Sequence, residues 1–308
     1  METQTAAMIS VIISSYNRAD YIVNAIDSLY NQTVDKNGYE IIVVDNNSTD
    51  NTEELCRNYI ASHGDANIIF LKETSQGSSY SRNAGAHAAK GDLFTFIDDD
   101  ALAFPDFLEK IRRFFTVHPE ASGLGGPIIP KYIPAEPEWM SYYVSSLVAN
   151  FDYSDEVTEF SKNRYPFEPN MTVTREAFFA INGFDTNLPG VVGKLRIGGE
   201  GKDFFFRLKA LGFRIFYDPE VKVHHVVEVK KLTSEYLYRV ASGQGRGERV
   251  RVKKIGASAY YSKVVEFIFK LGAAIILGIG YALKGKPKKT WPVIKFRIDA
   301  LKGLTQKF

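Results

Sequence analysis

The stretch LFTFIDDD, residues 93–100, joins a short apolar run to three consecutive aspartates. The apolar run Leu93–Ile97 is typical of a buried strand, so the acids follow at its carboxyl end. Three like charges this close repel one another, and each loses hydration when it leaves water. Carboxylate oxygens are ligands that suit magnesium and manganese ions. The stretch therefore predicts either a divalent metal site or a solvated acidic turn that caps the next helix.

Strands and helices alternate through the residues that surround this stretch. Apolar, β-branched runs predict further strands at Met8–Ser14, Tyr39–Asp45 and Asn67–Leu71. Amphipathic patterns predict helices at Asp20–Tyr30, from the polar run 46–50 to about Ala61, and at Ser79–Ala89. Such repeated units predict an α/β fold with a mostly parallel sheet that is flanked by helices on both faces. Ligands of these sheets bind outside the carboxyl ends of the strands, where Asp45 and the three aspartates lie.

The composition excludes some classes of protein. The chain has 308 residues, of which 45% are hydrophobic and 24% charged, so it can bury a large core in one domain or two unequal ones. Cys56 is the only cysteine, which excludes an intrachain disulfide framework and a cysteine-based metal site. The segment Met1–Met8 lacks the basic and apolar parts of a signal peptide, so we expect none there.

The charge is distributed unevenly along the chain. The formal net charge is +2, but residues 244–308 hold 15 Lys and Arg against 3 Asp and Glu, a net of +12, and residues 1–243 hold 23 against 33, a net of −10. This basic tail contains the apolar stretch Val264–Leu283, which is long enough to approach a membrane span but is interrupted by Glu266 and Lys270. Its uninterrupted part, Leu271–Leu283, is short for a bilayer crossing. These features favour an interfacial anchor on an anionic membrane, and the alternative is a helical hairpin packed on the catalytic domain or on a partner subunit. The basic residues have few interleaved aromatics and no known nucleic-acid-binding motif, so we expect no nucleic-acid partner.

Five segments of the chain resemble the family 2 glycosyltransferases, which have the GT-A fold and use nucleotide-sugar donors. They are SVIISSYNR (10–18), IIVVDNNSTDNT (41–52), SRNAGAHAAKGDLFTFIDDD (81–100), GGEGKDFFFRLKALGFRI (198–215) and VKVHH (221–225). The resemblance implies a GT-A-like catalytic domain over residues 1–230, with a nucleotide-sugar half to about residue 127 and an acceptor and catalytic-base half over 128–230. Residues 231–308 would then form a C-terminal helical extension.

The resemblance implies a nucleotide site after the first two strands. The family holds the nucleobase at the segment that here contains Ser14, Tyr16 and Asn17. Tyr16 offers a ring for stacking, and Asp45 could accept a hydrogen bond from a base N–H or could cap the following helix. Arg82, near the start of its helix, suits a phosphate group, or it could form an intrahelical ion pair.

The resemblance also implies a metal site at a D-x-D motif. Here Asp98 would contact the ribose or the metal, and Asp100 would bind Mn²⁺ or Mg²⁺ directly. The ion would bridge the diphosphate oxygens of the donor and act as a Lewis acid. A further ligand in many GT-A enzymes is a downstream histidine, and the match is His224 or His225. We prefer His224, because the family histidine ends its strand.

The catalytic base is the point where this chain departs from the family pattern. Many relatives carry Gly-Glu-Asp, and in some of them the aspartate is the base, whereas this chain has Gly201 at that position. Glu200 is our preferred base, and Asp203, about one helical turn later, is the alternative. Both acids could instead complement the dipole at the start of a helix.

The resemblance implies an inverting, metal-dependent transferase that moves a sugar from a nucleoside-diphosphate sugar, with UDP favoured, to a hydroxyl group. The acceptor would be a glycan, glycolipid or glycoprotein in cell-surface polysaccharide biosynthesis. We expect a peripheral or monotopic protein at the cytoplasmic face of a membrane. One alternative is a sugar-nucleotide nucleotidylyltransferase, which usually has a Gly-rich loop after its first strand, and residues 14–18 contain no glycine. Another is a non-catalytic glycan-assembly scaffold with a degenerate site, which the glycine at position 201 suggests.

Overall fold

The computed structural model describes residues 7–64 and 67–307, so most of the segment Met1–Met8 lies outside the described residues. The chain divides into two compact units. Unit 1 comprises Met1–Ile129, Phe151–Asp185 and Gly201–His225, and unit 2 comprises Pro130–Asn150, Thr186–Glu200 and Val226–Phe308. Two segments that we expected in the acceptor half of the catalytic domain therefore belong to the same unit as the C-terminal helices.

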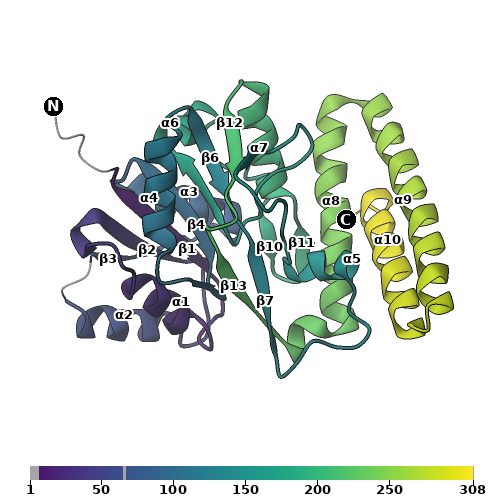
Figure 1. Ribbon diagram of the computed structural model, residues 1–308, viewed down its shortest axis with the longest axis horizontal. Helices are drawn as coiled ribbons and strands as arrows, with labels where there is room; N and C mark the ends of the chain where they lie inside the picture. The colour runs from purple at the N-terminus through teal and green to yellow at the C-terminus, as the bar shows by residue number, and fades with distance from the viewer. Residues whose placement is uncertain (1–6, 65–66, 308) are drawn as a thin grey trace. The chain divides into compact units, whose positions relative to one another are not determined.

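Unit 1 is built on an eight-stranded sheet with the order β3-β2-β1-β4-β9-β6-β12-β8 (Figure 1). Its strands are β1 (Ile9–Ser15), β2 (Tyr39–Asp45), β3 (Ile68–Lys72), β4 (Leu93–Asp98), β6 (Ala121–Gly125), β8 (Thr158–Glu159), β9 (Met171–Thr174) and β12 (Arg214–Tyr217). Strand β1 is parallel to β2 and β4, and β2 is parallel to β3. Strand β9 is antiparallel to both β4 and β6. The expected α/β fold with a mostly parallel sheet is confirmed.

Helices cover both faces of this sheet. They are α1 (Ile22–Tyr30), α2 (Thr52–Ser62), α3 (Ser78–Ala88), α4 (Phe107–Val117), α6 (Arg175–Ala180) and α7 (Glu200–Ala210), the last of which begins at the boundary between the units. Helix α4 shows why these segments are helical, because its buried residues Phe107, Leu108, Ile111 and Phe114 fall on one face at helical spacing. Helices α1 and α2 contact each other, whereas α3 packs on β1 and β2. Right-handed crossovers on the two sides of β1 put α3 on the opposite face from α1 and α2.

A second, three-stranded sheet has the order β5-β13-β7. Its strands are β5 (Ala101–Ala103), β13 (Val223–Glu228) and β7 (Ile128–Ile133). Strand β13 is antiparallel to β5, and His225 lies opposite Ala101. Because Ala101 directly follows the three aspartates, this pairing brings the histidine strand beside the acids.

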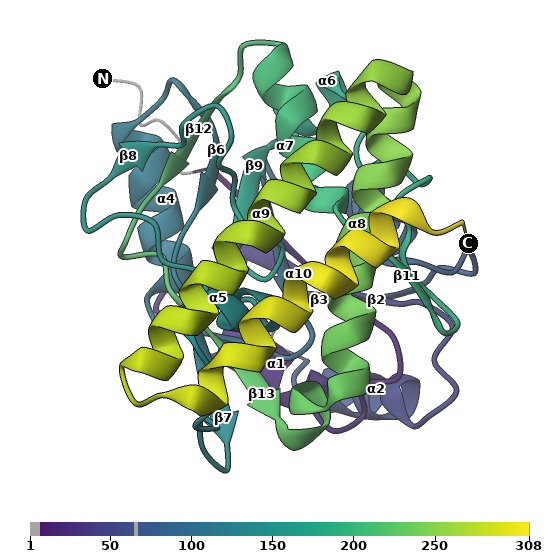
Figure 2. The same cartoon turned by 90° about the vertical axis from the view of Figure 1, so that its right-hand side faces the viewer.

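Unit 2 contains the C-terminal helices and two segments inserted earlier in the chain. Its elements include α5 (Tyr142–Ser145), the hairpin of β10 (Gly190–Val192) and β11 (Leu195–Ile197), and helices α8 (Ser234–Ile255), α9 (Ala257–Leu283) and α10 (Thr290–Thr305). Figure 2 shows α9 and α10 side by side, and both contact α8. Met140, Val144 and Leu147 share a buried apolar cluster with Val240 and Phe296 of these helices. The expected C-terminal helical extension is confirmed.

Helix α8 packs on its neighbours through glycines. A Cβ atom on Gly245 would lie 2.0 Å from the carbonyl oxygen of Ala300 in α10, and one on Gly247 would lie 1.6 Å from the carbonyl oxygen of Gly198. A Cβ atom on Gly303 of α10 would in turn lie 1.9 Å from the carbonyl oxygen of Ser242. The backbones are in direct contact at these points, so only glycine fits there. These contacts hold α8 against both α10 and the turn at residue 198.

Candidate active site

The carboxyl ends of β1, β2 and β4 bring together three residues that the sequence singles out. Ser15 of β1 lies opposite Asp45, and Ser14 lies opposite Asp98. The Ser14 hydroxyl is also 2.7 Å from the Ser81 hydroxyl at the start of α3. One edge of the sheet therefore carries Ser14, Asp45 and Asp98, as expected for ligand sites in parallel sheets.

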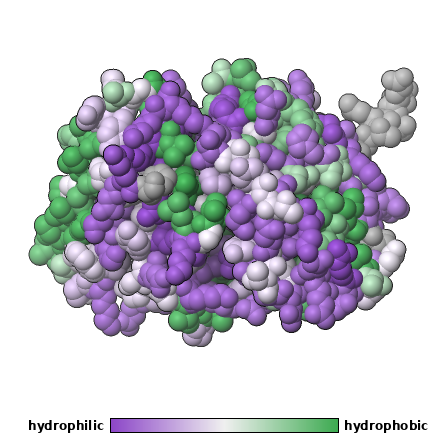
Figure 3. Space-filling view, turned by 180° about the vertical axis from the view of Figure 1, so that it is seen from behind, coloured by the Kyte–Doolittle hydropathy of each residue, from purple (hydrophilic) through white to green (hydrophobic). Residues whose placement is uncertain are grey.

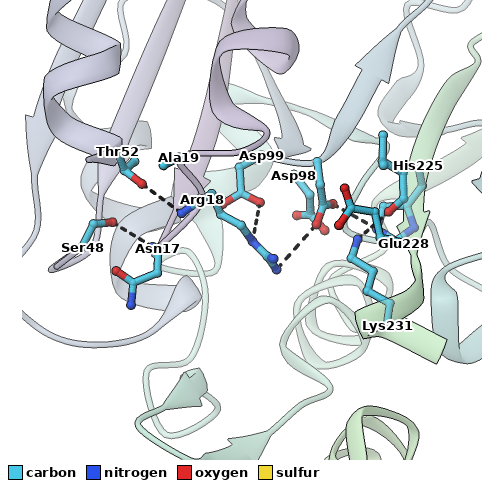
Figure 4. A network of polar contacts seen from close by, with 12 residues as sticks. Asn17, Arg18, Ala19, Ser48, Thr52, Asp98, Asp99, His225, Glu228 and Lys231 are labelled. Carbon is cyan, nitrogen blue, oxygen red and sulfur yellow. Dashed lines mark hydrogen bonds and ion pairs between the residues drawn. The ribbon is translucent and has the colours of Figure 1, made fainter. Parts of the chain in front are cut away.

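Asn17 joins the loops that follow β1 and β2. Its φ of 54° lies in the left-handed region, which asparagine tolerates better than most residues. The Asn17 N–H donates to the Ser48 hydroxyl at 2.9 Å (Figure 4). The Asn17 side-chain oxygen accepts the Thr49 N–H at 2.7 Å. The geometry gives Asn17 a structural task, while the neighbouring Tyr16 is partly exposed.

Asp45 is completely buried, and its two carboxylate oxygens have no hydrogen-bond partner within residues 7–64 and 67–307. It does not cap α2, because Asn51 is the N-cap residue and Asp50 accepts the Thr52 N–H at 3.1 Å. A buried polar group that lacks a partner costs about 1–3 kcal/mol. Asp45 is therefore suited to accept a hydrogen bond that a ligand would donate.

The three aspartates after β4 are each bound by a cationic or imidazole side chain. Arg18 Nε lies 3.2 Å from Asp99 Oδ1, and Arg18 Nη2 lies 3.5 Å from Asp100 Oδ2 (Figure 4). Arg82 of α3 donates to Asp98 Oδ1 at 3.1 Å, so it does not form the intrahelical pair that we considered. Asp99 and Asp100 are buried, whereas the Asp98 side chain retains 30% of its exposure.

The electrostatics of the cluster reflect this burial. Burial raises the pKa of the Asp99 carboxyl; the Arg18 guanidinium opposes the shift, and Asp100 and Asp98 add to it. In the part of the chain that the structure describes, no three His, Cys, Asp or Glu side chains form a ready-made metal cage. The donor set still fits Mg²⁺ or Mn²⁺, because such ions use one or two carboxylates and take other ligands from water and substrate phosphates.

The two adjacent histidines of β13 have different surroundings. His225 Nε2 lies 3.0 Å from Asp100 Oδ1, and both side chains are buried. The His224 ring instead stacks on Phe104, with ring centroids 4.7 Å apart. Successive side chains of a strand point to opposite faces, so only one of the two can reach the acids. The structure brings His225 to Asp100, whereas we had preferred His224.

The start of α7 holds the two acids proposed from the sequence. Asp203 Oδ2 accepts a hydrogen bond from Arg207 Nε at 2.7 Å, and the same guanidinium donates to the carbonyl oxygens of Ile181 and Gly183. Asp203 is thus part of a fixed structural network. Glu200 is buried at the first position of the helix.

Two residues of the site were missed among the candidates. Arg18 stands in the segment 10–18, directly after the first strand, and that position was a usable signal. Glu168 accepts a hydrogen bond from the Gly201 N–H at 3.0 Å. No local pattern marks Glu168, because it reaches α7 only through the fold.

Comparisons with known proteins identify the family of this chain. The model of the family described as "Glycosyl transferase family 2" matches residues 10–179. The chain is 26% identical over 247 residues to the glucosyl-dolichyl phosphate glucuronosyltransferase of Haloferax volcanii, covering 79% of this chain and 76% of that protein. It is 26% identical over 288 residues to the dolichyl N-acetyl-alpha-D-glucosaminyl phosphate 3-beta-D-2,3-diacetamido-2,3-dideoxy-beta-D-glucuronosyltransferase of Methanococcus voltae, covering 88% of this chain and 82% of that protein.

Solved structures show the same fold. The mannosyltransferase PcManGT from Pyrobaculum calidifontis, in complex with GDP-Man and Mn²⁺, has a TM-score of 0.68 at 20% identity, with 98% of this chain and 88% of that chain covered. S. aureus TarS 1–349 in complex with UDP has a TM-score of 0.55 at 17% identity, with 94% and 90% covered. At these identities the likeness concerns the fold, which is the GT-A type implied by the sequence motifs.

Proposed function

Because the chain belongs to glycosyl transferase family 2, we propose that this glycosyltransferase moves a sugar from a nucleoside-diphosphate donor to a hydroxyl group by a metal-dependent, inverting displacement. The observation that carries the proposal is the gathering of residues 98–100 with Arg18, Arg82 and His225 at the carboxyl edge of the sheet. Cationic side chains and carboxylates in one place suit a ligand that brings both a diphosphate and a divalent ion.

The donor's nucleobase would bind at the ends of β1 and β2. The buried Asp45 carboxylate can accept the N–H of uracil, and the partly exposed Tyr16 ring can stack on a base. Ser14 is the second-to-last residue of β1 and lies opposite Asp98. These features support UDP as the favoured nucleotide. Arg82, which now binds Asp98, can share its guanidinium between that carboxylate and a phosphate group.

The residues that would hold a metal ion are Asp98, Asp100 and a histidine of β13. We prefer His225 over His224 for this role, because His225 already contacts Asp100. A bound Mn²⁺ or Mg²⁺ ion would neutralise the charge that develops on the leaving diphosphate. Arg18 contacts Asp99 and Asp100, and its positive charge limits the repulsion among the three acids.

The proton of the attacking hydroxyl would go to a carboxylate at or beside the start of α7. Of the two acids that α7 itself carries, Glu200 remains the candidate, because Asp203 is bound by Arg207. One displacement at the anomeric carbon forms the new C–O bond as the bond to the diphosphate breaks, so the configuration inverts. The diphosphate leaves with the electron pair, and the carboxylate keeps the proton.

The acceptor would be lipid-linked and the enzyme would lie on the cytoplasmic membrane surface. Helix α9 is long and apolar enough to cross a membrane by length and composition, and only 11% of its most apolar stretch is buried. Large apolar side chains on it are exposed, namely Tyr261, Val265, Ile268, Phe269, Ile275, Ile276, Ile279 and Leu283. Figure 3 shows apolar surface at its left-hand edge, where the C-terminal helices lie in this view.

The charges of α9 support an in-plane position in the membrane interface. Glu266 binds both Lys263 and Lys270 at 2.5 Å, which lowers the cost of removing these groups from water. Four lysines follow the helix at positions 284, 286, 288 and 289, where they can meet anionic headgroups. The two archaeal relatives are named for dolichyl-phosphate substrates, which supports a lipid-linked acceptor.

A panel of nucleotide sugars, each with Mn²⁺, Mg²⁺ or EDTA, tests the function. We expect one donor to release its nucleoside diphosphate, with a metal requirement and with stimulation by a lipid-linked sugar acceptor. Release of pyrophosphate would indicate a nucleotidylyltransferase. No release from any donor would contradict the proposal and favour a scaffold.

Flotation with liposomes tests the membrane surface. The change of Phe269, Ile276 and Leu283 to serine removes three apolar side chains that are 77%, 74% and 84% exposed. We expect wild type to float with anionic liposomes and to release only partly in high salt, and the triple variant to stay in solution. A matched control changes Val117 and Leu211, exposed at 65% and 62%, to serine. Wild-type protein that ignores anionic liposomes would refute the membrane proposal.

A further inference from the structure

The carboxylate of Glu168 occupies the space that a side chain at position 201 would need. A Cβ atom on Gly201 would lie 2.6 Å from Glu168 Oε1 and 2.8 Å from its Cδ. The Gly201 N–H donates to the same Oε1 at 3.0 Å. Gly201 is not among the glycines with positive φ, so the helix backbone does not require glycine there. The glycine instead makes room for Glu168.

The segment that carries Glu168 is fixed at the same edge of the sheet as the three aspartates. Strand β9 is antiparallel to β4 and pairs Met171 with Phe96, so the residues before Met171 lie beside the end of β4. Asn170 holds this segment in place, because its side-chain amide donates to the carbonyl oxygens of Pro127 and Val221 at 3.1 Å and 2.7 Å. Glu168 is partly exposed, so a substrate can reach it.

We propose that Glu168 supplies, from the segment before β9, the carboxylate that position 201 lacks, and that it accepts the proton of the attacking hydroxyl. This inference rests on the proposed function and assigns its base to a residue outside α7. As the acceptor oxygen bonds to the anomeric carbon, its proton passes to Glu168 and the diphosphate leaves with the electron pair of the broken bond. The resulting carboxylic acid then returns the proton to water. The Gly201 N–H donates a hydrogen bond to Oε1 and so orients the carboxylate, whose oxygens can accept a proton.

The variant Glu168→Gln separates the chemical role from a structural one. Glutamine keeps an oxygen that can accept the Gly201 N–H, but it cannot take a proton at neutral pH. With the donor chosen by the panel, we expect kcat for nucleoside-diphosphate release to fall at least about 100-fold, as for the loss of a general base. We expect the donor KM, the Kd of the nucleoside diphosphate and the melting temperature to stay within error of wild type. The matched control Glu156→Gln, an exposed exchange of the same kind, should leave all four values unchanged.

Two further variants test the relation between positions 168 and 201. Gly201→Ala should lower kcat in the wild-type background, because its Cβ displaces the carboxylate, and it should have no further effect in a Glu168→Ala background. In the double variant Glu168→Ala with Gly201→Asp, kcat should be at least about tenfold higher than in Glu168→Ala. The aspartate at position 201 restores a carboxylate to the site.

The outcomes separate this inference from the proposed function. An active wild type in which Glu168→Gln keeps more than a third of kcat overturns the role of Glu168 alone. A result in which Glu200→Gln abolishes turnover and Glu168→Gln does not would also overturn it, and would leave Glu200 as the base. Equal costs of Gly201→Ala in both backgrounds would overturn it as well. A wild type that releases no nucleoside diphosphate from any donor overturns the proposed function itself.

Discussion

The three aspartates after β4 and Glu168, beside the start of α7, have different contacts. Asp98, Asp99 and Asp100 contact Arg82, Arg18 and His225, so side chains offset much of their charge. Glu168 receives a peptide N–H, which is a neutral donor. The first group gathers cationic side chains and carboxylates in one place, which suits a diphosphate and a divalent ion, whereas Glu168 stands where a side chain at position 201 would stand. The difference teaches that the first region is suited to binding charge and the second to moving a proton.

The change Asp100→Asn tests whether the aspartates after β4 bind a metal ion, and it should have the largest effect on turnover. A neutral amide is a poorer ligand for a hard cation, so we expect turnover to fall about 1,000-fold, because metal stabilisation of a leaving group contributes several kcal/mol. The fold should persist. Binding of the donor would be titrated with and without Mn²⁺, and an unchanged gain in affinity from the metal would show that Asp100 is not a ligand.

The variants His225→Ala and His224→Ala test which histidine of β13 belongs to the metal site. Loss of His225 should weaken the effect of Mn²⁺ on donor binding about 10- to 100-fold, as for groups that bind or support a metal ligand. Loss of His224 removes its stack on Phe104 and should cost about 1 kcal/mol of stability with little change in metal response. Isothermal titration and thermal melts measure the two effects. The reverse pattern would restore His224 as the metal-site residue.

The change Asp203→Asn tests whether this acid at the start of α7 accepts the proton, and it should have the smallest effect on turnover. Its partner Arg207 remains bound to the carbonyl oxygens of Ile181 and Gly183, so the helix start should survive. We expect a loss of about 0.5 kcal/mol for the i,i+4 pair and a change in kcat below about threefold. Steady-state rates at saturating donor give kcat for the variant and for wild type. A loss above about 100-fold would identify Asp203 as the proton acceptor and remove the contrast between the two regions.

Local sequence patterns predicted most of unit 1. Strand β2 has the predicted bounds Tyr39–Asp45, because an unbroken apolar run leaves no other buried arrangement. The carboxyl-end position of Asp45 and of the aspartates followed from the same runs. Patterns could not decide between His224 and His225, because the two alternate along one strand and only its partner β5 fixes which side faces the acids.

Long-range packing explains what the patterns missed. Glu168 and Gly201 are 33 residues apart, and nothing near either of them in the chain indicates the contact. Segments 130–150 and 186–200 join the C-terminal helices in unit 2, although the family motifs around them suggested one catalytic domain. The composition of α9 indicated an apolar helix. Which of its apolar side chains are exposed became clear only from its packing against α8 and α10.

The glycine contacts of α8 have a geometric consequence for a surface-bound enzyme. Helix α8 touches the turn at residue 198 on one side and α10 on another, and α9 packs on both helices. Packing contacts through α8 thus link α9 to the turn at residue 198 within unit 2. With α9 in the interface of a bilayer, as we propose, this packing would set the height of the turn at residue 198 above the lipid phosphates.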